Sequence, residues 1–435
     1  MKVLVITLNA WNDTGSTGNT ISNIFSHADN IEFANLYCRN EKINNRICKK
    51  YFRLTEDQII NGLIGKQVGI PFELNEWSVL EKGGYNPLNN GKLGNFLRKY
   101  RPNSLMFLRE VIWCLPNWKN FQLKKWLHEF NPDIIYMHGH ANIYMHRIME
   151  YCKIVTGAKV VLFFGDDMYG RKNKWPIGYC YETLYRHRLF RSIQLASLLF
   201  GGSIKLCKEY GSIFNRDFIP MFKQCNLSKL KSKTDTNTPL QIVYAGNLLF
   251  GREKTMCDFL QILKKVNEKY KKVKIQLLIY SNTQPSSENI QKLDDRHNSF
   301  FMGCKPYSEV CKALNDADMS LFLESFEQEN IRKTRLSFST KIIDCMQSDS
   351  AMLAIGPDNI ASMEYIIENG IGLTATSLDA TFSLLDSVVS APQLILESIA
   401  QKTNFARKNH SATSKQYIEQ IKKCYEENID STNQS

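Results

Sequence analysis

The sequence predicts an α/β protein with two successive Rossmann-like domains. Short apolar runs alternate with longer amphipathic helical patterns, from "KVLVITL" at residues 2–8 to "SLLFGGS" at residues 197–203, which is typical of a parallel sheet covered by helices. A polar stretch of mixed charge follows at residues 228–240, and the alternation then restarts at "QIVYAGN". We therefore expect an N-terminal domain at 1–227, a linker at 228–240, a C-terminal domain at 241–391 and a helical tail at 392–435 that crosses between the domains.

The apolar runs give the order of the elements. Further strands are expected at 133–139 and 159–165 in the first half, with helices at 16–28, 142–157 and 204–214. In the second half strands are expected at 241–247, 274–280, 299–303, 319–325, 351–355 and 371–375, again separated by helical patterns. Ligands of such sheets bind beyond the carboxyl ends of the strands, so we expect the polar loops there to gather along one cleft between the domains.

The chain carries an excess of positive charge. Lys and Arg number 55 against 43 Asp and Glu, which gives a net charge of +12. This charge suits phosphorylated metabolites, an anionic membrane surface or nucleic acid. Because no nucleic-acid recognition motif accompanies it, nucleic acid is not an expected partner.

The cysteines and the apolar runs indicate the compartment. The twelve cysteines are scattered without a CxxC pair, which is typical of reduced thiols in the cytoplasm. The opening run has no cleavage site of small residues and is expected to be a first strand. No apolar run approaches the roughly 18 residues of a membrane span, so we expect a cytoplasmic protein, free or peripheral on the inner face of the cell membrane.

The first polar loop, "NAWNDTGSTGNT", covers residues 9–20. Gly15 and Gly18 would let the backbone approach a ligand closely, and the helix that follows offers free N–H groups. The loop is neither GxGxxG nor a Walker motif, so a plain strand-to-helix turn is the alternative.

The second half has two loops in which cations stand where a helix begins. In "YAGNLLFGREKTMCDFL", Gly246 and Asn247 end a strand, and Arg252 and Lys254 precede a helix. A guanidinium and an ammonium at the positive end of a helix dipole are locally unfavourable but suit a diphosphate. The alternative is a solvated basic turn.

The other loop is "RLSFSTKIIDCMQSDSAMLAIGP", residues 335–357. Ser339 or Thr340 can cap the helix while Lys341 faces an anion. The alternative is an ordinary cap with a solvated lysine. Farther on, Glu364 falls in the first turn of a helix, where a glutamate is favourable in any case.

Two loops of the first half carry histidines and aspartates at strand ends. His138 and His140 lie in "YMHGHANIYMH", and Asp166 and Asp167 lie in "FFGDDMYGRK". Neither pair has the spacing of a zinc site, and one acidic dipeptide is weak evidence for another metal. We therefore expect no metal and no other cofactor, and His140 to be either a site residue or a structural one.

These loops, in this order, resemble the bacterial glycosyltransferases of family four, the retaining GT-B group, and most of all the capsule, exopolysaccharide and O-antigen biosynthesis subgroup. The resemblance rests on residues 335–357 with "ASMEYIIENGIGL", on "IVYAGNLLFGREK" and on "NDTGSTGNT". It implies the GT-B fold and a hexosyltransferase. Such an enzyme moves a sugar, with retention, from a nucleotide-diphosphate donor, here a UDP-sugar, to a growing lipid-linked surface polysaccharide.

The resemblance also implies roles for single residues. Arg252 and Lys254 would hold the donor diphosphate with Lys341 beside them, and Glu364 would accept the ribose hydroxyls. The backbone near Gly15 would approach the sugar and phosphates. His140 would face the donor sugar, so that His140, Arg252 and Lys341 form the catalytic set, and Asp167 would orient the acceptor.

The sequence departs from the family at one point. Many relatives carry two glutamates eight positions apart, and the equivalents here are Leu336 and Asp344. Glu324 or Glu327 are candidates to replace the first glutamate. The departure keeps two alternatives open: a GT-B sugar-nucleotide epimerase, and a non-catalytic glycosyltransferase-like partner subunit.

Residues 87–130 combine basic and aromatic side chains and predict docking to an anionic membrane surface. The alternative is that the aromatic residues belong to the core of the first domain. The residues concerned are Lys92, Arg98, Lys99, Arg101, Arg109, Lys119, Lys124 and Lys125, with Phe96, Phe107, Trp113, Trp118 and Trp126.

Overall fold

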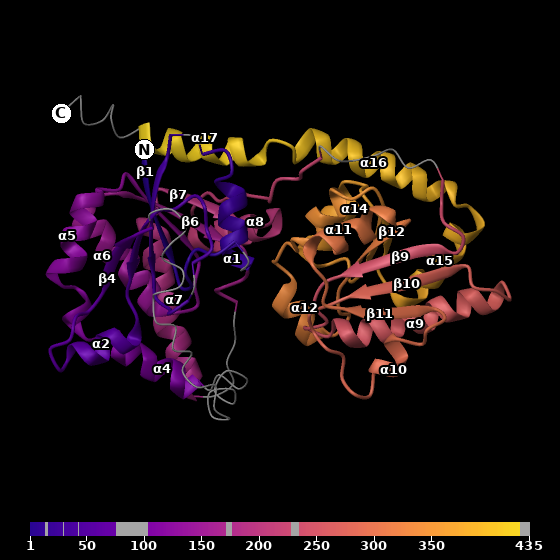
Figure 1. The fold of residues 1–435 in the computed structure, drawn as a ribbon, viewed down its shortest axis with the longest axis horizontal. Helices are drawn as coiled ribbons and strands as arrows, with labels where there is room; N and C mark the ends of the chain where they lie inside the picture. The colour runs from indigo at the N-terminus through magenta and orange to yellow at the C-terminus, as the bar shows by residue number, and fades with distance from the viewer. Residues whose placement is uncertain are drawn as a thin grey trace. The chain divides into compact units, whose positions relative to one another are not determined.

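The chain forms two compact units, each built around its own sheet (Figure 1). The computed structural model describes residues 1–13, 16–28, 30–41, 43–74, 103–170, 176–227 and 235–426. The first unit consists of Met1–Met221 with Ser414–Ser435, and the second of Phe222–Thr413. The first boundary thus falls at 221/222, and the tail expected at 392–435 divides between the units at 413/414.

The sheet of the first unit has the order β4-β3-β2-β1-β5-β6-β7-β8. All neighbouring strands pair in parallel except β3 and β4, which are antiparallel. The strands are β1 (Lys2–Thr7), β2 (Glu32–Tyr37), β3 (Lys50–Arg53), β4 (Ile70–Glu73), β5 (Ile134–His138), β6 (Lys159–Phe164), β7 (Leu198–Gly201) and β8 (Ile219–Pro220). The chain therefore starts at the centre of the sheet, with β1 between β2 and β5.

Helices cover both faces of this sheet because its central strands are apolar on both faces. Val3 and Val5 of β1 share a core with Ile21 of α1 and with Tyr417 and Ile421 of α17, while α6 packs against β1 and β5. The described helices of this unit are α1 (Ser16–Ile24), α2 (Glu56–Gly62), α4 (Asn103–Ile112), η1 (Pro116–Trp118), α5 (Phe121–Phe130), α6 (Ile143–Thr156), α7 (Pro176–Leu195), α8 (Ile204–Phe214) and α17 (Thr413–Glu426).

The sheet of the second unit is entirely parallel, in the order β11-β10-β9-β12-β13-β14. Its strands are β9 (Leu240–Ala245), β10 (Ile275–Tyr280), β11 (Ser299–Gly303), β12 (Met319–Leu323), β13 (Ala351–Ile355) and β14 (Leu373–Ala375). The strand order reverses between β9 and β12, which is where a doubly wound sheet opens a crevice for a ligand.

Alternate side chains of these strands pack into two cores. Ile242 and Leu321 lie in the core with α9, α15 and α16, whereas Phe322 and Met352 lie in the core with α13 and α14. The described helices are α9 (Arg252–Lys269), α10 (Ile290–Leu293), α11 (Tyr307–Asp316), α12 (Gln328–Thr334), α13 (Lys341–Met346), α14 (Ala361–Glu368), α15 (Leu378–Ser390) and α16 (Gln393–Asn409).

A buried lysine fixes α16 within the second unit. The Lys402 ammonium donates to the carbonyl oxygens of Cys345 (2.9 Å) and Ser348 (2.8 Å) and to that of Ser350. Burial lowers the pKa of Lys402 to about 8. The ammonium thereby binds carbonyl groups at and beyond the end of α13.

Among the described helices, none alone is long and apolar enough to cross a membrane. One pair, Leu378–Ser390 with Gln393–Glu426, passes that test of length and composition together and bends by 105° between its members.

Candidate functional site

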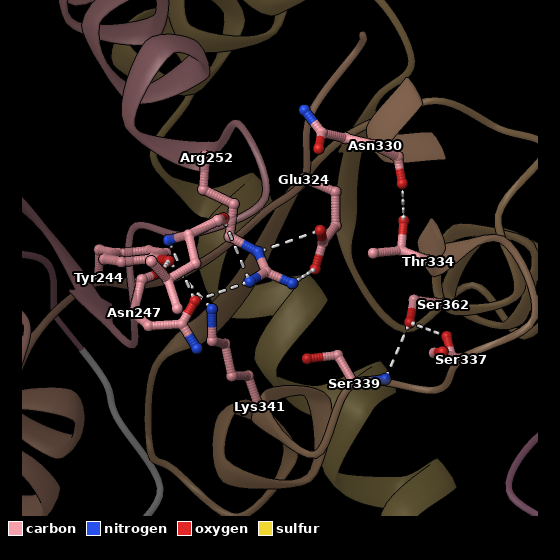
Figure 2. Close-up of polar contacts among 11 residues, drawn as sticks. Tyr244, Asn247, Arg252, Glu324, Asn330, Thr334, Ser337, Ser339, Lys341 and Ser362 are labelled. Atoms are coloured by element: carbon pink, nitrogen blue, oxygen red, sulfur yellow. Dashed lines mark hydrogen bonds and ion pairs between the residues drawn. The ribbon is translucent and has the colours of Figure 1, made fainter. Parts of the chain in front are cut away.

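In the second unit, the residues predicted to bind a diphosphate lie where the strand order reverses. Arg252 begins α9 after β9, and Lys341 begins α13 after β12. Figure 2 shows their side chains in one polar network with Tyr244, Asn247 and Glu324. The carboxyl ends of β9 and β12 therefore bring together two cations that are 89 positions apart in the sequence.

Arg252 is buried and bound on all three of its guanidinium nitrogens. Its Nε and Nη2 donate to the two carboxylate oxygens of Glu324 at 3.0 and 2.8 Å, and its Nη1 donates to Asn247 Oδ1 at 2.8 Å. Glu324 directly follows β12 and is only 3% exposed. A bidentate pair of this kind fixes the plane of the guanidinium, so Arg252 is here an ordered part of the protein and not a solvated cation.

Lys341 is partly buried beside this pair. Its Nζ donates to Tyr244 Oη at 3.0 Å and lies 4.9 Å from the centroid of that ring. A Cβ at position 246 would lie 2.5 Å from this Nζ, so a larger residue there would displace the lysine side chain from its present position. Burial, followed by the charge of Arg252, lowers the pKa of Lys341 to about 8. Two cations with one carboxylate leave a positive, partly desolvated site, and such a site favours an anion.

The two residues before Lys341 do not cap its helix as expected. Thr340 occupies the N-cap position without a side-chain capping bond, and Ser339 uses its amide to donate to Ser362 Oγ at 3.0 Å. Ser362 in turn donates to the Ser337 carbonyl. The expected side-chain cap is therefore wrong, because α14 holds this loop in its place.

The other two donor-binding residues predicted in the second unit are Lys254 and Glu364. Lys254 is exposed, and its Nζ contacts Glu327 at 2.8 Å. Glu364 lies in the first turn of α14, as its sequence position predicts, and is half-buried. Both therefore remain predictions as donor-binding residues.

In the first unit, the start of α1 packs closely on the backbone of the glycine-containing loop that follows β1. A Cβ on Gly18 would lie 2.1 Å from the carbonyl oxygen of Asn12, so the first turn of α1 needs glycine to pack on that loop. Asp13 fixes the loop by accepting from Ser22 and Asn45. Gly15 lies outside the described residues.

His140 follows β5, beside β1, where the strand order of the first sheet reverses. Its carbonyl accepts from His146 Nε2 and from Tyr185 Oη, both at 2.9 Å, which fixes the backbone of the loop. Its own Nε2 is buried and has no hydrogen-bond partner. An unsatisfied buried nitrogen costs about 1–3 kcal/mol, which a bound ligand could recover.

His140 is neutral at physiological pH. Burial, helped by the neighbouring His138 and His146, lowers the pKa of His140 to about 3. A neutral imidazole can exchange hydrogen bonds with a hydroxyl group, but it brings no charge to the site.

Asp167 has a structural role in the turn after β6. Its Oδ1 accepts from the amides of Tyr169 (3.0 Å) and Gly170 (2.9 Å) and from Tyr210 Oη (3.0 Å). In the part of the chain that the structure describes, no three His, Cys, Asp or Glu residues form a group that could hold a metal ion.

The aromatic side chains expected at a membrane surface lie mostly inside the first unit. Trp113, Trp118 and Trp126 are buried, so the alternative that these aromatic residues belong to the core of the first unit is confirmed for them. Trp113 stacks on Tyr144 with 4.3 Å between ring centroids, and such stacking adds to the burial of the two rings. Phe107 is exposed, and residues 87–102 of the docking stretch lie outside the described residues.

Sequence reasoning missed the pairing of Glu324 with Arg252 and the contact of Tyr244 with Lys341. A signal was present for the first, since Glu324 ends the otherwise apolar run "MSLFLES". Nothing in the sequence, however, distinguishes it from Glu327 as the partner of Arg252.

No family model and no curated protein sequence matches the chain. Solved structures match it over nearly its whole length. Sucrose-phosphate synthase from Thermosynechococcus elongatus has a TM-score of 0.61 at 10% identity, covering 99% of both chains. Anabaena Alr3699/HepE, solved with UDP and glucose, has a TM-score of 0.60 at 10% identity, covering 97% of this chain and 100% of its own.

The lipopolysaccharide outer core galactosyltransferase WaaB, in its apo form, has a TM-score of 0.54 at 16% identity, covering 93% of this chain and 99% of its own. At such identities a likeness concerns the fold. The two units with their parallel sheets and these matches confirm the predicted α/β fold class, and the chain has the GT-B fold.

Proposed function

We propose that the protein is a glycosyltransferase that uses a nucleotide-diphosphate sugar, most simply a UDP-sugar. The observation that most directly supports this proposal is the network of Arg252, Glu324 and Lys341, which lies where the strand order of the second sheet reverses. Its net positive charge and partial burial suit a diphosphate, and HepE, which has the same fold, was solved with UDP. The observation supports the donor class and leaves the sugar open.

In the proposed reaction, the bond from the sugar C1 to the diphosphate oxygen breaks. A new bond forms between C1 and the acceptor hydroxyl oxygen, and the hydroxyl proton passes to the departing diphosphate. Negative charge then grows on the leaving group, where the Lys341 ammonium and the charge of Arg252 would stabilise it electrostatically. We propose that no metal is needed for this, and that attack on the front face retains the configuration at C1.

We further propose a lipid-linked bacterial surface saccharide as acceptor, and peripheral attachment to the inner face of the cell membrane. Exposed apolar side chains of the first unit support attachment: Ile60, Leu63 and Ile64 at the end of α2, and Phe107 and Val111 one turn apart on α4. Arg109 of α4 holds α2 by donating to Glu56 at 2.7 Å, and the exposed Lys66 follows the α2 residues. Apolar side chains beside a lysine suit an anionic lipid surface.

Vesicle sedimentation tests the attachment. The protein should sediment with vesicles that contain anionic lipid, and the double variant L63S/I64S should stay in the supernatant. The matched control is I154S, which changes another exposed isoleucine, on α6. Equal sedimentation of L63S/I64S and the unmodified protein would contradict attachment through the end of α2.

The transfer itself is tested with a panel of radiolabelled sugar nucleotides, with and without membrane extract. Label passing to lipid-extractable material is the expected result. Conversion of the sugar nucleotide without any acceptor would favour the epimerase. The absence of turnover, with Leu336 buried at the position of a family glutamate, would favour the non-catalytic subunit.

A further inference from the structure

Arg252 cannot present its Nε–Nη2 edge to a diphosphate without giving up partners that the protein already supplies. Its Nε–Nη2 edge, the edge that usually receives a phosphate, is filled by both oxygens of Glu324. Its Nη1 is bound by Asn247. Withdrawing the guanidinium would leave the nearly fully buried Glu324 carboxylate without its counter-charge, which is strongly unfavourable.

A second lysine/arginine–glutamate ion pair in this unit, Lys254 with Glu327, differs from the Arg252–Glu324 pair in its exposure to solvent. Lys254 and Glu327 contact each other at 2.8 Å, but the lysine is two-thirds exposed and the glutamate nearly half exposed. Solvent can replace either partner there at little cost. Of these two carboxylates, only Glu324 holds a buried cation beside Lys341.

We propose that Glu324 is an internal counter-anion of the donor site: it keeps Arg252 in place, leaves Lys341 as the direct ligand of the donor diphosphate, and limits how tightly the diphosphate leaving group is held. Glu324 is thus a positioning residue that acts through the two cations. The proposal rests on the proposed function for the identity of the ligand.

The consequence for turnover follows from charge. With Glu324 ionised, Arg252 and Lys341 present one net positive charge to a nucleoside diphosphate, and without it they present two. A site with two uncompensated cations would bind the product more tightly and release it more slowly. Glu324 therefore favours product release at the expense of affinity.

The first test measures UDP binding by calorimetry at pH 7, with inorganic pyrophosphate as a probe that carries no base. E324Q keeps the size of the side chain and removes its charge, and it should bind UDP about tenfold more tightly, with kcat and KM both lowered. E324D, which keeps the charge, should bind UDP as the unmodified protein does. The control for affinity is E329Q, which breaks the exposed pair of Glu329 with Lys333 on α12 and should change the affinity less than twofold.

A purely structural role for Glu324 gives a different pattern. E324Q would then bind UDP more weakly, or E324D and E324Q would change the affinity alike, and either result overturns the proposal.

The second test needs no nucleotide and separates this proposal from the proposed function. The charged or ionisable groups that act on Lys341 are Arg252, Glu324, Asp344 and Cys345, with the Tyr244 hydroxyl in contact. Of these, Glu324 raises the pKa of Lys341, so E324Q should lower it and speed the labelling of Lys341 by an amine-reactive reagent at pH 7. The labelling is followed by peptide mass spectrometry.

E327Q should leave the labelling rate unchanged. Faster labelling in E324Q together with no binding of UDP or pyrophosphate by any form would sink the proposed function and leave the charge coupling intact. Equal labelling in E324Q and E327Q would overturn the coupling whatever binds.

Discussion

The two units place different chemistry at the same position of the same topology. In both sheets the first strand of the unit lies where the strand order reverses, β1 beside β5 and β9 beside β12. At that point the first unit has His138, His140 and the nearby His146, whose pKa values burial lowers to about 3, 3 and 4. At the same point the second unit has the two cations Arg252 and Lys341, and the Glu324 carboxylate pairs with Arg252.

The difference shows what decides whether a buried group keeps its charge. The histidines have neutral partners, such as the Tyr136 hydroxyl for His138 and the Ser192 hydroxyl for His146, so desolvation removes their charge. Arg252 instead has the buried Glu324 carboxylate as its partner. Topology therefore positions a site, and the provision of a counter-charge determines its electrostatics.

Breaking the buried pair should have the largest effect. R252A leaves the Glu324 carboxylate buried without a partner and should lower the free energy of unfolding by about 3–5 kcal/mol, measured by urea denaturation. K254A, which breaks the exposed pair, should cost less than about 1 kcal/mol. The double variant R252M/E324L should recover most of the loss. Equal stability of R252A and K254A would mean that burial does not distinguish the two pairs.

Removing the less constrained cation should affect the reaction instead of the fold. K341A should lower kcat/KM for transfer by about 30- to 1000-fold, the equivalent of about 2–4 kcal/mol of transition-state stabilisation. The control is K333A, which removes an exposed lysine paired with Glu329 on α12. Near-normal transfer by K341A would withdraw Lys341 from the site.

Acid should destabilise the first unit more than the second. The folded pKa values of the three histidines lie below the usual value of 6.5, so the unfolded chain binds more protons, and stability falls as the pH drops below 6.5. Glu110 acts in the opposite direction, since burial raises its pKa to about 7. For these four groups together, the net loss from pH 7 to pH 5 should be about 3–4 kcal/mol.

Hydrogen exchange, corrected for intrinsic rates, assigns this loss to one unit or the other. Protection in β5 and α6 should fall at pH 5, whereas protection in β9 and β12 should change less. The reverse pattern would show that the histidines do not set the acid stability of the first unit.

Chelation should have the smallest effect. Transfer activity should survive EDTA, because the proposed stabilisation of the leaving group depends on fixed cations. If EDTA abolished the activity and manganese or magnesium restored it, Asp166 and Asp167 would become candidate metal ligands. The site of Arg252 and Lys341 would then need a divalent cation to stabilise the leaving group.

The sequence predicted the parts of this comparison that depend on local pattern. Apolar runs identified β1, β5, β6 and β9 because parallel strands are buried on both faces. The strands β2, β3 and β4 were not predicted. The β3 run "KYFR" is short and mixed, and the antiparallel β3–β4 pairing depends on contacts that no local pattern specifies.

The features of the candidate site also divide into those that the sequence predicted and those that it could not. A cation at each of two helix starts predicted that Arg252 and Lys341 serve one site, and the structure brings them together. Their electrostatics could not be predicted, because Glu324 lies 72 positions from Arg252 and its pairing depends on the packing of β12 beside β9. The neutrality of His140 likewise depends on tertiary burial.

The contacts of the Lys402 ammonium predict how the second unit unfolds locally. Helix α13 has only six residues, too few to persist through its own hydrogen bonds, and Lys402 of α16 binds carbonyl groups at its far end. The element that starts with Lys341 should therefore lose its structure whenever α16 detaches, as one cooperative unit. A chain cut before residue 393 should lose the donor site although every residue that forms it is still present.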